Sequence, residues 1–329
     1  MGKKLLFVGI DTSNYTTSAA LCDETGRILL NRKIPLPVKE GEKGLRQSDA
    51  VFHHVRGIPE AAEALRETLA LYSGDGYRIG CIGYSAYPRD NTGSYMPCFL
   101  SGKAAAEFAS ALLGVPAYAF SHQAGHVMAA LASACENSGL EKSEMMGKPF
   151  LAFHVSGGTT DVLLCRPGSA GGHLFEIEQV GGTKDINAGQ AIDRCGVLMG
   201  IPFPCGAEMD LAALRFEGKV RRDKISVDGT HCNLSGLENK SAAMYRETGS
   251  AEETSAYVLD FIGRTLEKVT LNALERYGDM PVIYAGGVMS SAYIKKRLSQ
   301  YGCFASPQYS SDNASGTALL AREKFFSEQ

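Results

Sequence analysis

A strand–turn–strand pattern near the N-terminus occurs again in the middle of the chain, and this repeat constrains the fold more than any other feature. Residues 4–11 are predicted to form a buried strand, and a Thr-Ser-Asn-Tyr-Thr-Thr turn leads to a second strand at 18–22. Residues 150–155 repeat the strand, and a Ser-Gly-Gly-Thr-Thr-Asp turn leads to a strand at 162–165. Such turns present hydroxyl and backbone N–H groups to a phosphate. The repeat therefore predicts a duplicated α/β fold with a phosphate-binding turn in each half.

The second turn and a later glycine pair favour binding of a nucleotide. Gly157 and Gly158 allow backbone amides to approach an anion. A predicted strand also runs into Gly286 and Gly287 at the start of a helix, which fits a nucleotide against bare backbone. Asp193, on another predicted helix, is either a solvated acid or an acceptor for ribose hydroxyls.

Two histidines are candidates for binding a metal. The Ala-rich run after Ser121 has strong helix propensity, and Ser121 is a plausible N-cap. His122 and His126 then lie one turn apart on one face, where both can bind one metal ion. On its own, such a histidine pair more often forms hydrogen bonds with neighbouring backbone groups than binds a metal. Asp312, ahead of the last predicted helix, is either an N-cap or the third ligand, which would leave metal positions open for substrate.

Asp11 and Ser13 are the candidate catalytic residues in the first turn. Asp11 ends the first strand, so it is either a turn former or acts through metal or water near a phosphate. Ser13 follows it within the same turn.

The composition predicts a soluble cytosolic protein. The 33 basic and 36 acidic residues nearly balance, so any contact with RNA must come from a local patch. Nine cysteines, an odd number without a Cys-x-x-Cys pair, favour reduced thiols. No signal peptide is expected, because the strand at 5–10 runs straight into Asp11. No apolar run reaches the roughly 18 residues that a membrane span needs.

Six motifs in a fixed order resemble the TsaD family of threonylcarbamoyltransferases from residue 5 to residue 322. They are Gly-Ile-Asp-Thr-Ser at 9–13, Ser-His-Gln-Ala-Gly-His at 121–126, Val-Ser-Gly-Gly-Thr-Thr at 155–160, Ala-Gly-Gln-Ala-Ile-Asp at 188–193, Ala-Gly-Gly-Val at 285–288 and Ser-Asp-Asn at 311–313. The resemblance implies the ASKHA fold of actin, Hsp70 and sugar kinases, with a ligand cleft between two lobes. Lobe I is expected at 1–120, with a C-terminal helix at 312–329 returning to it, and lobe II at 121–311.

The resemblance also assigns roles to individual residues. His122, His126 and Asp312 match the family's ligands for one divalent metal ion, iron or zinc. The expected ligand is an adenine nucleotide, either ATP or an acyl-adenylate. The residues expected to bind it are Val155, Ser156, Gly157, Gly158, Thr159, Asp193, Gly206, Gly286, Gly287 and Ser291.

The implied reaction moves a threonylcarbamoyl group from threonylcarbamoyl-adenylate to the exocyclic amine of adenosine 37 in tRNA. A paralogous TsaB and the ATPase TsaE are the implied partners, and no membrane is involved.

Departures from the family pattern leave alternatives open. Where the family has Glu-Thr-Ser-Cys-Asp-Glu-Thr, residues 11–17 read Asp-Thr-Ser-Asn-Tyr-Thr-Thr, so an acidic pair is lost from the first turn beside Asn14 and Tyr15. The later motifs differ from those of the family at Thr159 and Ser291. Residues 35–54 also lack the family's Pro-Glu-Leu-Ala-Ser-Arg-x-His run. These differences favour a diverged paralog. It could be a carbamoyltransferase with another acceptor, or a non-catalytic nucleotide-binding partner of such an enzyme.

Overall fold

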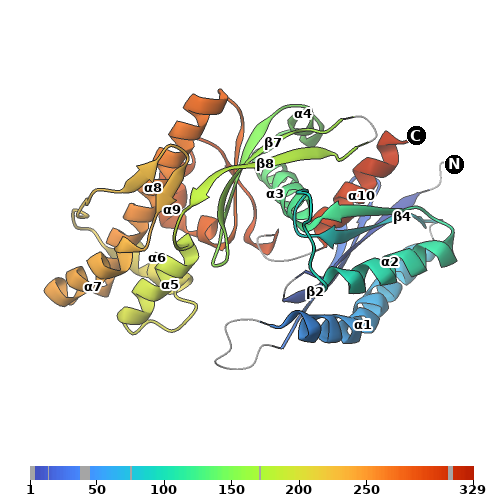
Figure 1. Ribbon diagram of the computed structural model, residues 1–329, viewed down its shortest axis with the longest axis horizontal. Helices are drawn as coiled ribbons and strands as arrows, with labels where there is room; N and C mark the ends of the chain where they lie inside the picture. The colour runs from blue at the N-terminus through green and yellow to red at the C-terminus, as the bar shows by residue number, and fades with distance from the viewer. Residues whose placement is uncertain (1–3, 14, 38–44, 75, 170–171, 310–313) are drawn as a thin grey trace. The chain divides into compact units, whose positions relative to one another are not determined.

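Two β-sheets organise the protein, one in each of two units (Figure 1). The computed structural model describes residues 4–13, 15–37, 45–74, 76–169, 172–309 and 314–329. Unit 1 comprises Met1–Ala132, Gly168–Glu176 and Ser311–Gln329, and unit 2 comprises Ser133–Pro167 and Ile177–Ser310. The division thus falls after Ala132, whereas the sequence analysis expected lobe II to begin at Ser121. The reason is that the helix after Ser121 begins against the C-terminal helix, which belongs to unit 1.

Unit 1 contains a five-stranded sheet in the order β3-β2-β1-β4-β5. Strands β1, β2 and β3 pair antiparallel, whereas β4 and β5 extend the sheet parallel to β1. The elements are β1 (Leu5–Asp11), β2 (Thr16–Asp23), β3 (Ile28–Pro35), α1 (Gln47–Ser73), β4 (Arg78–Tyr87), α2 (Phe99–Leu113), β5 (Ala117–Ser121), α3 (His122–Ser138, which continues into unit 2) and α10 (Ser315–Ser327).

Helices cover both faces of this sheet. On one face α10 approaches so closely that a Cβ added to Gly9 would meet the Ala314 carbonyl oxygen at 2.4 Å. The next side chain along β1, Ile10, points to the opposite face, where it faces Gly102 of α2. Helices α1 and α2 lie side by side in this unit (Figure 1). This packing fixes the C-terminal end of β1, which carries Asp11.

Unit 2 contains a seven-stranded sheet in the order β12-β11-β6-β7-β8-β10-β9. Its hairpin β6–β7 is antiparallel, like β1–β2 of unit 1, and β11 runs parallel to β6. The elements are α4 (Lys142–Met146), β6 (Phe150–Val155), β7 (Thr160–Pro167), β8 (Phe175–Thr183), α5 (Ala188–Leu198), α6 (Gly206–Arg215), β9 (Ser226–Asp228), β10 (His231–Asn233), α7 (Gly236–Thr248), α8 (Ala251–Tyr277), β11 (Val282–Ala285), η1 (Gly287–Ser290), α9 (Ala292–Leu298), β12 (Cys303–Phe304) and η2 (Pro307–Tyr309).

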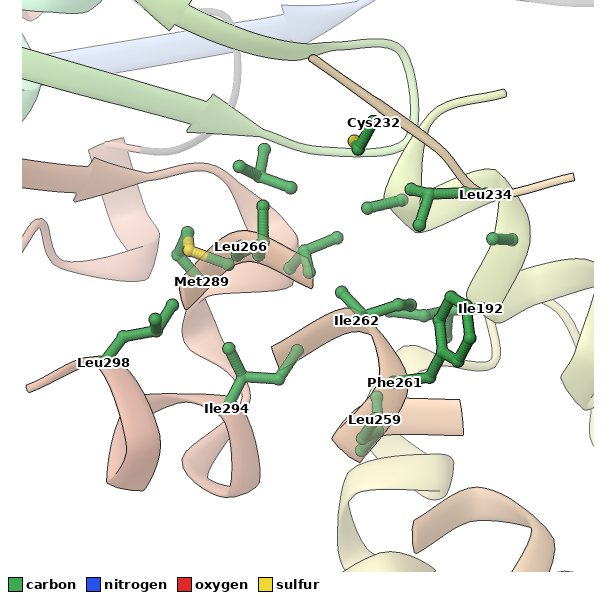
Figure 2. Packing of buried hydrophobic residues seen from close by; sticks show 14 of the residues in the cluster. Ile192, Cys232, Leu234, Leu259, Phe261, Ile262, Leu266, Met289, Ile294 and Leu298 are labelled. Atoms are coloured by element: carbon green, nitrogen blue, oxygen red, sulfur yellow. The ribbon is translucent and has the colours of Figure 1, made fainter. Parts of the chain in front are cut away.

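Helix α8 is the centre of the core of unit 2. It begins at a true N-cap, because the Ser250 hydroxyl accepts a hydrogen bond from the backbone N–H of Glu253 at 3.1 Å. Figure 2 shows Ile262 and Leu266 of α8 among apolar side chains from neighbouring elements, including Ile192 of α5 and Met289 of η1. Burying each such side chain contributes about 1.5–3 kcal/mol. The core therefore holds α5, α6, η1 and α9 at fixed positions around α8.

Among the described residues, no helix has both the length and the apolar character needed to cross a bilayer.

Candidate functional site

A cavity of about 680 Å³ lies within unit 2. The turn after β6, helices α5 and α6, and η1 contribute most of its wall. The wall contains these residues singled out from the sequence: Gly157, Asp193, Gly206, Gly287 and Ser291. The volume lies within the usual range of about 300–1,000 Å³ for small-molecule sites. Segments separated by more than a hundred residues in the chain are thus brought to one site.

At three glycines of this wall, the packing of the protein does not require a residue without a side chain. A Cβ added to Gly157, Gly206 or Gly287 would find no atom within 4 Å, and none of the three has a left-handed φ. By contrast, a Cβ on Gly189 would meet the Gly157 backbone nitrogen at 2.6 Å, and one on Gly286 would meet the Val155 carbonyl oxygen at 2.2 Å. Space is therefore left open against bare backbone at three points of the cavity, as a close ligand requires.

The other predicted nucleotide-binding residues shape the turn rather than line the cavity. Val155 is fully buried in the core. The Ser156 backbone N–H donates to the Thr159 carbonyl oxygen at 2.7 Å, and the Ser156 hydroxyl accepts from the Gly158 N–H at 3.3 Å. These bonds, together with Gly286 against Val155, hold the turn in place.

Two carboxylates lie in the cavity wall, and they differ in how many hydrogen bonds they accept from the protein. One oxygen of Asp193 accepts the Cys205 backbone N–H at 2.8 Å, and its other oxygen has no hydrogen-bond partner in the part of the chain that the structure describes. Asp210 instead accepts hydrogen bonds from the Ser291 hydroxyl and from the N–H groups of Ala292 and Tyr293 at the start of α9. Asp193 is thus the acid free to receive a ligand hydroxyl.

Sequence reasoning missed Asp210, although a signal for it exists. It lies four residues after Gly206 on α6, which places both on one helix face. Ser291 also turns out to be an N-cap, because its hydroxyl accepts the Ile294 N–H at 3.2 Å.

An apolar wall completes the cavity. Phe203, Ile192, Leu211 and Leu259 line it, and the Phe203 side chain is 74% exposed. The Phe203 ring is therefore accessible to a ligand in the cavity. A flat apolar group such as a nucleobase suits this wall.

A polar cluster in unit 1 contains the histidine pair, whose side chains are only partly buried. The Nδ1 atom of His122 lies 3.2 Å from Asp11 Oδ1, and the Ser13 hydroxyl donates to Asp11 Oδ2 at 2.7 Å. The Nε2 atoms of His122 and His126 lie 2.9 Å apart, so either one donates to the other or both face a common cation. Asp11 and Ser13 are fully buried.

Local sequence explains the position of the pair. The Ser121 hydroxyl accepts the Ala124 N–H at 3.1 Å, which starts α3 at His122. The structure thus brings Asp11, Ser13 and both histidines together. Asp312, the predicted third ligand, lies outside the described residues, as does Asn14. Among the residues with described positions, no group of three or more His, Cys, Asp or Glu could hold a metal ion.

The cluster fits a metal in its donor chemistry. A histidine that binds a metal through one ring nitrogen usually donates the N–H of the other to a carboxylate, as His122 can donate to Asp11. Zinc–nitrogen bonds are about 2.0–2.1 Å, and the 2.9 Å between the Nε2 atoms is short enough for both to reach one ion.

His54 of α1 is a further buried histidine. Its side chain is fully buried, and its Nδ1 lies 2.8 Å from the Thr17 hydroxyl. Burial lowers the pKa of His54 to about 4, although the negative charge of Asp11 opposes this and His53 adds to it. The protein therefore holds His54 neutral.

This burial predicts an acid-sensitive stability. The unfolded chain binds a proton at His54 near pH 6.5, whereas the folded protein binds it only near pH 4. Above about pH 6.5 His54 is neutral in both states and does not lower the free energy of unfolding. As the pH decreases from 6.5 to 4, proton binding by the unfolded chain lowers the free energy of unfolding by up to about 3 kcal/mol. Urea unfolding should show that the free energy of unfolding decreases less between pH 7 and pH 4.5 in His54→Gln than in the wild-type protein. His53→Gln, on the same helix but only partly buried, is the control. An equal loss in all three proteins would contradict the prediction.

Comparison with known proteins decides the family. The profile of TsaD, tRNA N6-adenosine threonylcarbamoyltransferase, matches residues 48–319. The chain belongs to the TsaD family. A relative of that description from Christiangramia forsetii is 26% identical over 98% of this chain and 94% of its own. Another from Streptococcus suis is 29% identical over 91% of this chain and 84% of its own. The protein is therefore a transferase of the TsaD type, as predicted.

Solved structures confirm the predicted fold class. Component A of the (R)-2-hydroxyglutaryl-CoA dehydratase of Acidaminococcus fermentans matches with a TM-score of 0.51 and 13% identity over 98% of this chain and 99% of its own. HypF of T. kodakarensis matches with a TM-score of 0.53 and 12% identity over 99% of this chain and 48% of its own. This TsaD-family chain thus has the α/β ASKHA fold, and the roles of its individual site residues stay predictions.

Proposed function

We propose that the protein transfers a threonylcarbamoyl group from threonylcarbamoyl-adenylate to the exocyclic amine of adenosine 37 in tRNA. One observation carries this proposal: a cavity of nucleotide size with three glycines that the protein's own packing does not require, in a chain of the TsaD family. Two of the positions that depart from the family pattern take part in the local structure: the Ser291 hydroxyl caps α9, and the Thr159 carbonyl oxygen closes the turn after β6.

The cavity would bind the adenylate part of the substrate. Gly157 and Gly287 line the cavity and carry no side chain of their own, so an acyl-phosphate can approach their backbone N–H groups. The free oxygen of Asp193 can accept ribose hydroxyls. The ring of Phe203 can stack on the base. These donors would also stabilise negative charge on the phosphate as it leaves.

His122, His126 and Asp312 would hold a divalent iron or zinc ion. When bound, such an ion supplies a Lewis acid that polarises an acyl or phosphoryl oxygen. Asp11 is fully buried and contacts His122, so we assign it the orientation of that ring rather than contact with substrate. Ser13 holds the second oxygen of Asp11 in place.

Transfer of labelled threonine carbon from threonylcarbamoyl-adenylate to tRNA tests the proposal directly. The full-length protein is supplied with iron or zinc and with TsaB-like and TsaE-like partners from its own source. We expect label in wild-type tRNA and none in tRNA with guanosine at position 37. Absence of label, with the cavity still binding adenylate, would contradict the tRNA reaction and favour another carbamoyl acceptor. Absence of both label and metal binding would favour a non-catalytic nucleotide-binding partner.

A further inference from the structure

A second groove in unit 2, of about 450 Å³, has basic side chains at its rim. It lies between the end of α6, the loop that follows, and α9. Gly218 and Val220 line it, so Lys219 and Arg222 lie within two residues of its wall. Burial and Asp260 raise the pKa of Tyr293 in that wall, and the positive charges of Arg297 and Arg222 oppose this rise. The wall includes Leu214, Phe216, Val220, Tyr293, Lys296 and Arg297.

Positive charge is concentrated around this groove in a chain with a net charge of −3. The loop at 216–225 carries four cationic and two acidic side chains, and α9 carries three consecutive cations at 295–297. Lys219, Arg222 and Lys296 are exposed, and none has an ion-pair partner among residues with described positions. Their charges are thus available to an external anion.

The protein holds the groove walls in place without using these three cations. The Tyr257 hydroxyl donates to Asp223 Oδ2 at 2.8 Å, and Arg264 donates to the Asp223 carbonyl oxygen at 3.0 Å, so the loop is tied to α8. Arg297 pairs with buried Asp260 at 2.7 Å, which fixes α9 on the same helix. A pre-formed site loses less entropy when it binds a ligand than a mobile one does.

The groove and the nucleotide cavity share two helices. Asp210 of α6 lines the cavity, and Ala213, one turn later, lines the groove. Ser291 at the start of α9 lines the cavity, and Tyr293 lines the groove. One turn of helix is about 5 Å, so an anion in the groove lies next to the cavity.

We propose that this groove binds the phosphate backbone of the RNA acceptor through Lys219, Arg222 and Lys296. The inference rests on the proposed transfer to tRNA and adds the location of the RNA contact on this chain. RNA is favoured over an acidic protein because three exposed cations without ion-pair partners among the described residues can neutralise regularly spaced phosphates without needing shaped pockets for side chains.

Reversing the charge of one groove cation tests the inference. Lys296→Glu should weaken binding of unmodified tRNA by the full-length protein about tenfold, and it should reduce the slope of log affinity against log salt by about one. Arg222→Glu combined with Lys296→Glu should weaken it further. Arg276→Glu is the matched control, because Arg276 is an exposed cation of the same unit at the far end of α8. Affinity for an adenine nucleotide should stay within about twofold of wild type in all variants, since the groove cations do not line the cavity.

The outcomes separate the groove from the reaction. Equal tRNA affinity and salt slope for wild type and Lys296→Glu would overturn the groove assignment, even where transfer to tRNA occurs. Groove-dependent binding of RNA by a protein that transfers no label would overturn the proposed reaction and support the groove. Competition by poly-glutamate as strong as that by RNA of equal charge would overturn the assignment in favour of an acidic protein.

Discussion

Gly157→Val is expected to weaken binding of an adenine nucleotide by about 100-fold or more while the protein stays folded. A Cβ at Gly157 meets no protein atom within 4 Å, so the branch point of the new side chain fits without displacing the surrounding protein. Gly157 lines the cavity, so the added methyl groups occupy space that the ligand needs. Losing one or two hydrogen bonds to a charged phosphate costs about 1.5–3 kcal/mol each, and each 1.4 kcal/mol is a factor of ten in affinity.

The neighbouring glycine gives a matched control. A Cβ at Gly158 also meets no atom within 4 Å, but Gly158 does not line the cavity. Gly158→Val should therefore bind nucleotide within a fewfold of wild type. Gly189→Ala serves as the opposite control, because its Cβ would meet the Gly157 nitrogen at 2.6 Å and should lower the unfolding temperature as well as the affinity.

The chain offers a clean spectroscopic measurement. It contains no tryptophan, so Phe203→Trp introduces a single fluorophore at the cavity wall. Stacking of adenine on the indole should quench its emission, and titration in this background should give the affinities of all three glycine variants. Equal affinities for Gly157→Val and Gly158→Val would place the nucleotide elsewhere on the protein.

Local sequence patterns predicted the elements that depend on the spacing of apolar residues and on turn-forming residues. Both hairpins are confirmed: β1–β2 and β6–β7 are antiparallel pairs around the predicted turns. Helix α8, Ala251–Tyr277, depends on the same kind of pattern, because its apolar residues recur with helical period and face the core.

Tertiary context determines what the sequence could not show. Residues 207–250 are polar and mixed in sequence, yet they contain α6 and α7, because Met209 and Leu237 are buried in the core around α8. Asp210 escaped notice for the same reason, since its partners at the start of α9 are about 80 residues away. The hydrogen bond between Asp11 and His122 spans 111 residues and likewise depends on the order of strands in the sheet.

His126→Ala is expected to abolish stable metal binding and to reduce transfer to tRNA by about 1,000-fold. Alanine removes one of two described nitrogen donors, and the remaining ligands would bind an ion too weakly to keep it through dialysis. The metal content of protein loaded with iron or zinc and then dialysed gives the first measurement. Nucleotide affinity gives the second and should not change, because the cavity belongs to unit 2.

Asp11→Asn separates the role of orienting His122 from that of binding metal. Because Asp11 contacts the Nδ1 of His122 and not its Nε2, we expect metal affinity to fall by about 10–100-fold rather than to vanish. His173→Ala, a change of an exposed histidine in the same unit, should leave metal content and transfer unchanged. Full metal content in His126→Ala would mean that the 2.9 Å contact is an ordinary hydrogen bond between two imidazoles. In that case the reaction would depend on the backbone donors and Asp193 of the cavity, and Asp11→Asn would affect stability but not metal content.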